Sequence, residues 1–123
     1  MPILQIINRK LPLYDLEERT LKFAKKIIEY TEKLPKTLAN SEISKQLIRS
    51  GGSVGANYIE ANEALGKKDF LMKIKISKKE AKESRYWLSL SRAVEGDGKE
   101  REVLIQESTE LMKIFGSILE KSK

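Results

Sequence analysis

The sequence has 123 residues, which is enough for one domain with a hydrophobic core that needs neither disulfides nor a structural metal. It contains no cysteine and no histidine, which excludes disulfides, thiolate nucleophiles, histidine general bases and the commonest metal sites. No apolar run approaches the roughly 18 residues of a membrane span, and residues 1–10 lack the small-residue cleavage site of a signal peptide. We therefore expect a cytoplasmic protein that binds no membrane, metal or cofactor.

The first predicted elements are an irregular N-terminal arm over residues 1–13 and a helix over residues 15–33. Asp15 followed by Glu18 forms a capping box, the side-chain pattern that opens a helix. Leu34-Pro35 ends this helix, because proline disfavours the helical conformation of the residue before it.

Three further helices are predicted, over residues 41–65, 67–94 and 98–120. Asn40 or Ser41 caps the first of these, and Gly66 closes it as a left-handed C-terminal residue. No stretch alternates apolar and polar residues as a strand does. Because helices joined by short connections favour antiparallel neighbours, we predict an all-α, up-and-down antiparallel four-helix bundle spanning residues 14–121.

The second predicted helix is rich in glycine and apolar around most of its circumference. Gly51, Gly52 and Gly55 fall within five positions, although each costs a helix about 1 kcal/mol relative to alanine. Such glycines indicate the close approach of another backbone, within the bundle or across subunits. Gly52 and Gly55 also join Ile48 and Ile59 in a second apolar line beside the core stripe. A helix that is apolar on most sides is buried on most sides, so we expect self-association, unless the N-terminal arm covers these lines.

A polar strip of fixed spacing lies on the same helix, with Arg49, Ser53, Asn57 and Glu60 on one face. On the third helix, Glu80 and Glu83 lie beside the second apolar line that includes Ile76 and Trp87. Because an unpaired buried charge is costly, Arg49 is expected to pair with Glu80, Glu83 or Glu60 in a buried network that fixes the register between helices. The predicted subunit interface or buried polar network comprises Arg49, Ser53, Asn57, Glu60, Glu80, Glu83, Gly52, Gly55, Ile76 and Trp87.

The net charge is concentrated in the third predicted helix. Residues 67–92 hold nine cations and three anions, which accounts for the whole formal charge of +6. At about 100° per residue, most of these cations share one arc that faces away from the core line. This arc is either an ordinary solvated face or a footprint for phosphate. As a nucleic-acid-binding face it comprises Lys67, Lys68, Lys75, Lys78, Lys79, Lys82, Arg85 and Tyr86, the last positioned to stack on an unpaired base.

Motifs for catalysis are absent from the sequence. The glycine-rich segment at 51–55 lacks the Gly-Lys-Ser/Thr ending of a phosphate-binding loop and does not follow a strand. Without histidine, neither a Ser-His arrangement nor the Glu-x-x-His pairs of a di-metal bundle can exist. We therefore predict that the protein is not an enzyme and has no catalytic or metal-binding residue.

Several strings in the sequence resemble one known family. They are Leu34-Pro35-Lys36, the pattern Gln46-Leu47-x-Arg49-Ser50-x-x-Ser53-Val54-x-x-Asn57-x-x-Glu60, and Lys68-Asp69-Phe70 followed by Glu80 and Glu83. With Tyr14-Asp15-Leu16-Glu17 at the start, the chain is similar over about residues 14–120 to bacterial four-helix bundle proteins related to the 23S ribosomal RNA intervening-sequence proteins. It departs from their pattern in Glu60-Ala61, where Glu-Gly is expected, and in its N-terminal arm.

The resemblance implies an up-and-down bundle that assembles into a homopentamer, with helix packing across subunits. It also implies kinship with the pentameric accessory proteins of diversity-generating retroelements, which engage a reverse transcriptase and nucleic acid. The family itself has no settled biochemical function. Two functions are therefore predicted as alternatives: a homo-oligomeric bundle that binds RNA through the basic face, or a protein-binding accessory or scaffold ring without nucleic-acid affinity.

Overall fold

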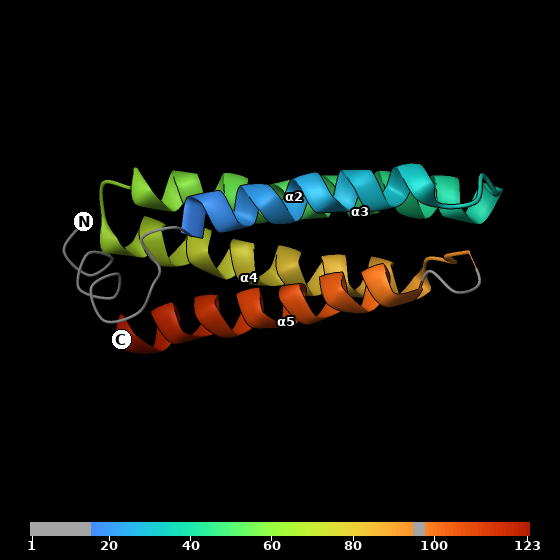
Figure 1. The fold of residues 1–123 in the computed structure, drawn as a ribbon. Helices are drawn as coiled ribbons and strands as arrows, with labels where there is room; N and C mark the ends of the chain where they lie inside the picture. Colours follow the sequence, from blue (N-terminus) through green and yellow to red (C-terminus); the bar gives the residue numbers. More distant parts are fainter. Residues whose placement is uncertain (1–15, 95–97) are drawn as a thin grey trace.

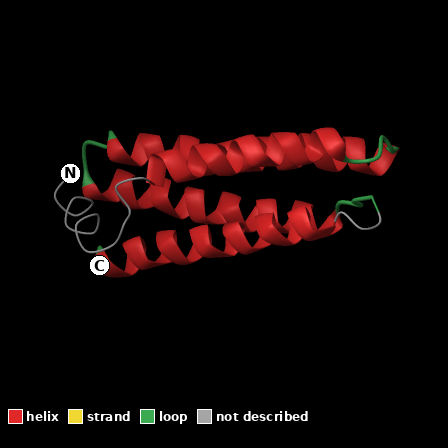
Figure 2. Cartoon of the chain, viewed as in Figure 1, coloured by secondary structure: helices red, strands yellow, loops and turns green. Residues whose placement is uncertain are grey.

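The structure is a computed structural model, and it describes residues 16–94 and 98–123. The predicted arm at 1–13 and the capping residue Asp15 lie outside the described residues. Within those ranges the chain forms four helices and no strand (Figure 2). They are α2 (Leu16–Lys33), α3 (Leu38–Asn62), α4 (Lys67–Leu90) and α5 (Gly98–Lys121). Successive helices run in opposite directions (Figure 1), so the predicted all-α, up-and-down bundle is confirmed.

The four helices are packed as a square in which each has two neighbours. Among the four neighbouring pairs, α3–α4 and α4–α5 make the most extensive contacts, followed by α2–α3. The contact between α2 and α5 is the least extensive of the four. Helices α2 and α4 are therefore diagonal across the bundle. The chain end at α5 and the α3–α4 connection lie at the same end of the bundle (Figure 1).

A single core of large side chains runs along the inside of the square. Its fully buried aromatic side chains are Phe23, Tyr58, Phe70 and Phe115, one from each helix. Tyr58 and Phe115 meet across α3 and α5 with their ring centroids 6.0 Å apart. Each helix thus contributes one large anchor at helical spacing from its aliphatic neighbours, which is the pattern expected of a bundle.

The start of α3 differs from the predicted boundary of residue 41. The helix begins at Leu38, because Thr37 is its cap and accepts a hydrogen bond from the Asn40 backbone at 3.1 Å. The Asn40 side chain instead donates to the carbonyls of Pro35 and Arg92 and accepts from the Arg92 backbone, each at 3.0 Å. Asn40 therefore ties the α2–α3 corner to the end of α4.

Two other helix ends were predicted too late in the chain. Helix α3 ends at Asn62, and Gly66 is not its left-handed end but the extended residue before α4, with φ of −141°. Helix α4 ends at Leu90, because the backbone of Ser91 is extended. The Ser91 hydroxyl lies 2.6 Å from the Tyr30 hydroxyl of α2. The end of α4 is thus fixed by a contact with α2, which sequence spacing does not reveal.

Small residues bring α3 close to both of its neighbours. Toward α4, the Ser50 and Ser84 hydroxyls lie 2.8 Å apart, and Ser77 donates to the Val54 carbonyl at 2.9 Å. Toward α2, a Cβ added at Gly51 would lie 2.6 Å from Ile27, and one at Gly55 would lie 2.7 Å from Thr20. Gly55, which was predicted to lie in a subunit interface or buried polar network, therefore makes its close contact with α2 of the same chain.

Candidate nucleic-acid interface

A polar network joins α3 to α4 on the outside of the bundle. The Arg49 guanidinium donates to both carboxylate oxygens of Glu80, at 3.4 and 3.3 Å, and also to Glu83. Glu83 in turn accepts a hydrogen bond from the indole Nε1 of Trp87 at 2.9 Å. Arg49 thus pairs with two of the three glutamates that the sequence offered. The network is not fully buried in the single chain, because the Arg49 side chain is 46% exposed.

The remaining members of the predicted polar strip take other partners. Glu60 pairs with Lys73 of α4 at 2.7 Å, so it does not contribute to the Arg49 network. Asn57 donates to the Ser53 carbonyl one turn earlier in α3, at 2.9 Å. The strip therefore forms two separate cross-links between α3 and α4, one at Arg49 and one at Glu60.

The network favours the ionised form of Glu83. The hydrogen bond from Trp87 and then the pairing with Arg49 lower the pKa of Glu83 below its ordinary value of 4.5. A carboxylate whose pKa is lowered by folding stabilises the folded state at pH values above its ordinary pKa. This contribution is lost as the pH falls through the folded-state pKa.

The lowered pKa of Glu83 predicts how the stability of the fold depends on pH. Between about pH 6 and about pH 3, the unfolding free energy of the wild type is expected to fall more steeply than that of Glu83→Gln, which has no carboxylate at this position to protonate. Urea unfolding at a series of pH values measures both curves. Parallel curves would show that Glu83 is not stabilised as an anion.

The outer face of α3 and α4 also exposes apolar side chains. Ile48 and Ile59 on α3 are 41% and 45% exposed, and Gly52 between them has no atom within 4 Å of an added Cβ. On α4, Met72 and Leu90 are exposed, whereas Ile76 and Trp87 are half-buried. This surface, which we call the α3–α4 apolar face, is defined by Ile48, Gly52, Ile59, Met72 and Leu90.

The predicted basic residues gather along the solvent side of α4. Six of them are exposed lysines: Lys67, Lys68, Lys75, Lys78, Lys79 and Lys82. None of the six forms an ion pair with a carboxylate among the described residues. Arg85 is half-buried and donates to the Thr109 hydroxyl of α5 at 3.2 Å. The α4 face therefore presents a row of lysines that form no ion pair within the described part of the chain.

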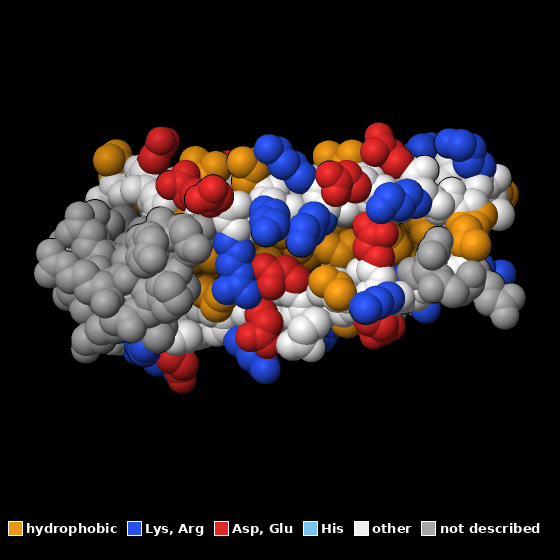
Figure 3. All heavy atoms as spheres, viewed as in Figure 1, with side chains coloured by type: hydrophobic (Ala, Val, Ile, Leu, Met, Phe, Trp, Pro, Cys, Tyr) orange, Lys and Arg blue, Asp and Glu red, His pale blue; other side chains and the backbone are white. Residues whose placement is uncertain are grey.

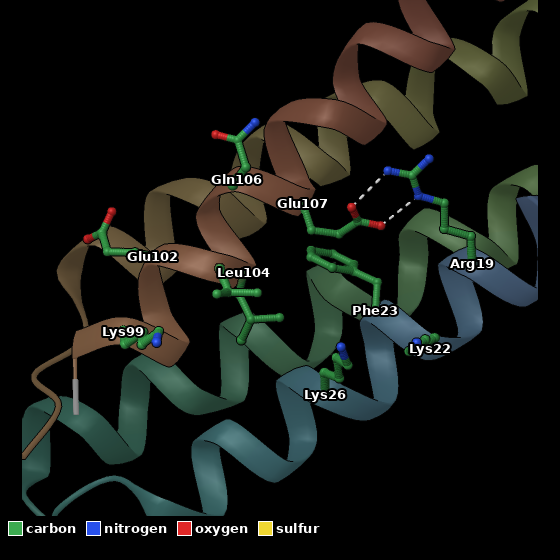
Figure 4. A pocket seen from close by; sticks show the side chains of 10 residues that line it. Arg19, Lys22, Phe23, Lys26, Lys99, Glu102, Leu104, Gln106 and Glu107 are labelled. Atoms are coloured by element: carbon green, nitrogen blue, oxygen red, sulfur yellow. Dashed lines mark hydrogen bonds and ion pairs between the residues drawn. The ribbon is translucent and has the colours of Figure 1, made fainter.

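A second surface, which the sequence did not indicate, lies between α2 and α5. It is a groove of about 580 Å³ with Phe23 and Leu104 at its base (Figure 4). Arg19 and Glu107 face each other across it in a two-pronged ion pair, at 2.7 and 2.8 Å. Lys22, Lys26 and Lys99 add positive charge to its lining. Figure 3 shows hydrophobic side chains between charged ones along this side of the bundle.

Local sequence patterns do not indicate this groove, because its parts come from opposite ends of the chain. Arg19 and Glu107 are 88 residues apart, and nothing in their local patterns relates them. Lys73 was also missed, because its pairing with Glu60 depends on how α4 is rotated against α3.

Within the described ranges, no three or more His, Cys, Asp or Glu residues are placed to hold a metal ion. None of the described helices is both long and apolar enough to cross a membrane.

Comparison with known proteins places the chain in a family. Residues 14–117 match the family described as 23S rRNA-intervening sequence protein. The chain belongs to this family. A crystal structure of a protein of unknown function from the S23 ribosomal protein family of Bacteroides thetaiotaomicron VPI-5482 is 34% identical, with a TM-score of 0.69. The match covers 84% of this chain and 96% of that one. Among curated proteins, none matches this chain significantly.

Membership of the intervening-sequence protein family confirms the resemblance seen in the Arg49–Glu60 pattern. The residues of that pattern have structural roles in the single chain. Arg49 and Glu60 cross-link α3 to α4, Ser50 lies against Ser84, and Val54 accepts from Ser77. The pattern thus describes how α3 packs on α4, and it assigns no chemistry to the surface of this family member.

Proposed function

We propose that this member of the intervening-sequence protein family is a non-enzymatic, homo-oligomeric bundle that binds RNA through the basic face of α4. The observation that carries the proposal is the row of six exposed lysines without ion-pair partners among the described residues. A phosphate backbone supplies the negative charge that such a row lacks. Lysine suits backbone attraction more than base reading, so the face favours affinity over sequence specificity.

The test is a fluorescence-anisotropy titration of labelled structured RNA, single-stranded RNA and duplex DNA, repeated from about 50 to about 200 mM salt. Tighter binding to RNA than to DNA, with an affinity that falls steeply with salt, is the expected result. Weak binding to all three would contradict the proposal. It would favour the alternative of a protein-binding accessory, for which the groove between α2 and α5 offers an apolar base with a basic lining.

The proposed association uses the α3–α4 apolar face. Exposed Ile48 and Ile59 flank Gly52, where an approaching helix meets no side chain. Burying such a line against a second copy removes apolar surface from water, and closed homo-oligomers are the commonest assemblies of soluble chains. The family resemblance supports a ring of five subunits.

A charge placed on this face is expected to dissociate the oligomer. The double variant Ile48→Glu, Ile59→Glu buries two unpaired carboxylates if it associates, so we expect a monomeric mass by size-exclusion chromatography with light scattering. The control is Leu21→Glu, Ile28→Glu on α2, whose side chains are comparably exposed at 53% and 43%. It should keep the wild-type mass. A wild type that is monomeric at all concentrations would contradict the proposed association.

A further inference from the structure

Tyr86 is the one aromatic side chain in the proposed basic face, and its ring packs against Trp87. It is 58% exposed and lies in edge contact with Trp87, with ring centroids 5.1 Å apart and planes at 70°. Trp87 is fixed in turn by its hydrogen bond to Glu83, and Glu83 by its pairing with Arg49. A continuous chain of contacts therefore runs from α3 to the exposed tyrosine ring.

Two lysines lie on the same side of α4 as this ring. Lys82 and Lys79 precede Tyr86 by one and two helical turns, so the three side chains lie in one row along the helix. An aromatic ring beside a row of backbone-binding cations is the combination used by surfaces that bind single strands. Bases in a duplex are stacked and paired, and they cannot lie flat on such a ring without being extruded.

We infer that Tyr86 is a stacking platform for an unpaired base, and that it makes the α4 face selective for single-stranded over double-stranded RNA; this inference rests on the proposed RNA binding. Trp87 and Glu83 are positioning residues. They contact no nucleotide and limit the orientations of the Tyr86 ring, so less conformational entropy is lost when a base stacks on it.

The experiment compares wild type and Tyr86→Ala for binding to a labelled oligouridine, which has no stable structure, and to a fully paired RNA hairpin. Loss of one stacked base is expected to weaken oligouridine binding about 5- to 100-fold, with less than about a twofold change for the hairpin. The salt slope for oligouridine should be unchanged, because tyrosine carries no charge and its removal releases no counterion. Tyr86→Phe keeps the ring and should bind as the wild type does.

Trp87 supplies a spectroscopic readout, since it is the only tryptophan in the chain. A base stacked on Tyr86 lies next to the indole, so oligouridine should change Trp87 emission in the wild type and in Tyr86→Phe but not in Tyr86→Ala. For the positioning role, Glu83→Ala should weaken oligouridine binding selectively. Glu83→Gln, whose amide oxygen still accepts from the indole, should restore part of the loss.

Equal losses on oligouridine and hairpin, or no loss in Tyr86→Ala, would overturn the stacking role while leaving RNA binding by the lysines intact. A wild type that binds neither RNA overturns both the inference and the proposed function. The two failures are distinguishable because replacing the lysines affects both ligands and the salt slope, whereas replacing Tyr86 affects one ligand and no slope.

Discussion

Gly55→Leu is expected to lower the free energy of unfolding by about 3 kcal/mol, through overpacking inside the bundle. A Cβ at this position would lie 2.7 Å from Oγ1 and 3.1 Å from Cβ of Thr20 on α2. Thr20 cannot easily retreat, because its hydroxyl donates to the carbonyls of Leu16 and Glu17, both at 2.9 Å. A leucine must therefore push α2 away from α3. Urea unfolding followed by circular dichroism measures the loss.

The matched control is alanine at two glycines of the same helix. Within the single chain, Gly52→Ala meets no atom within 4 Å, so at protein concentrations at which the chain is monomeric it should raise the unfolding free energy by up to about 1 kcal/mol through helix propensity. Gly55→Ala should lower it, because the contact with Thr20 outweighs the same gain in propensity. Measuring both at two protein concentrations separates effects on folding from effects on association. Shifts of the same sign and size would contradict the close packing of Gly55 on α2.

The helices themselves were predictable because their apolar lines keep one period over their whole length. The inward line of α2, formed by Leu16, Thr20, Phe23, Ile27 and Tyr30, is buried at every position. The line of α5, from Leu104 to Ile118, is buried at every position as well. Only a continuous inward face produces such a pattern.

Helix ends were less predictable because distant residues decide them. Asn40 is a good capping residue by type, yet its side chain is taken by Pro35 and Arg92, and the cap moves to Thr37. Gly66 is likewise typical of a left-handed helix end, but its backbone is extended and precedes α4. In each case a local preference is compatible with more than one position, and at Asn40 the contact with the end of α4 selects among them.

The polar and glycine positions of α3 show what spacing can and cannot predict. Spacing placed Arg49 on one face, and the cost of an unpaired charge predicted a carboxylate partner, which the structure places on α4. Spacing did not predict that Gly55 contacts α2 of the same chain, because glycines indicate that a backbone comes close without indicating which one. That depends on the rotation of α3 against α2, which is set by packing over the whole helix.

Reversing three lysines of α4 is the variant expected to affect RNA binding most. In the proposed complex, Lys75→Glu, Lys79→Glu, Lys82→Glu would remove three adjacent phosphate contacts and add repulsion at each position. At about 1 kcal/mol per position, the loss in affinity is about 100-fold or more. For single-stranded RNA, the slope of log affinity against log salt should become shallower by about 2, since each contact contributes about 0.7. Anisotropy titrations across salt measure both quantities.

A loss of affinity in this variant has two possible explanations: the RNA binds locally on α4, or it is attracted by the overall net charge. A second variant separates them. Lys22→Glu, Lys25→Glu, Lys26→Glu on α2 also takes the formal charge from +6 to zero, but α2 lies diagonally across the bundle from α4. Its exposed lysines can be reversed without touching the α4 face. Retained affinity and slope in the α2 variant, together with their loss in the α4 variant, would locate the RNA on α4. Equal losses in both would instead indicate attraction to the overall charge of the molecule, because a non-specific field does not distinguish opposite sides of a bundle at low salt.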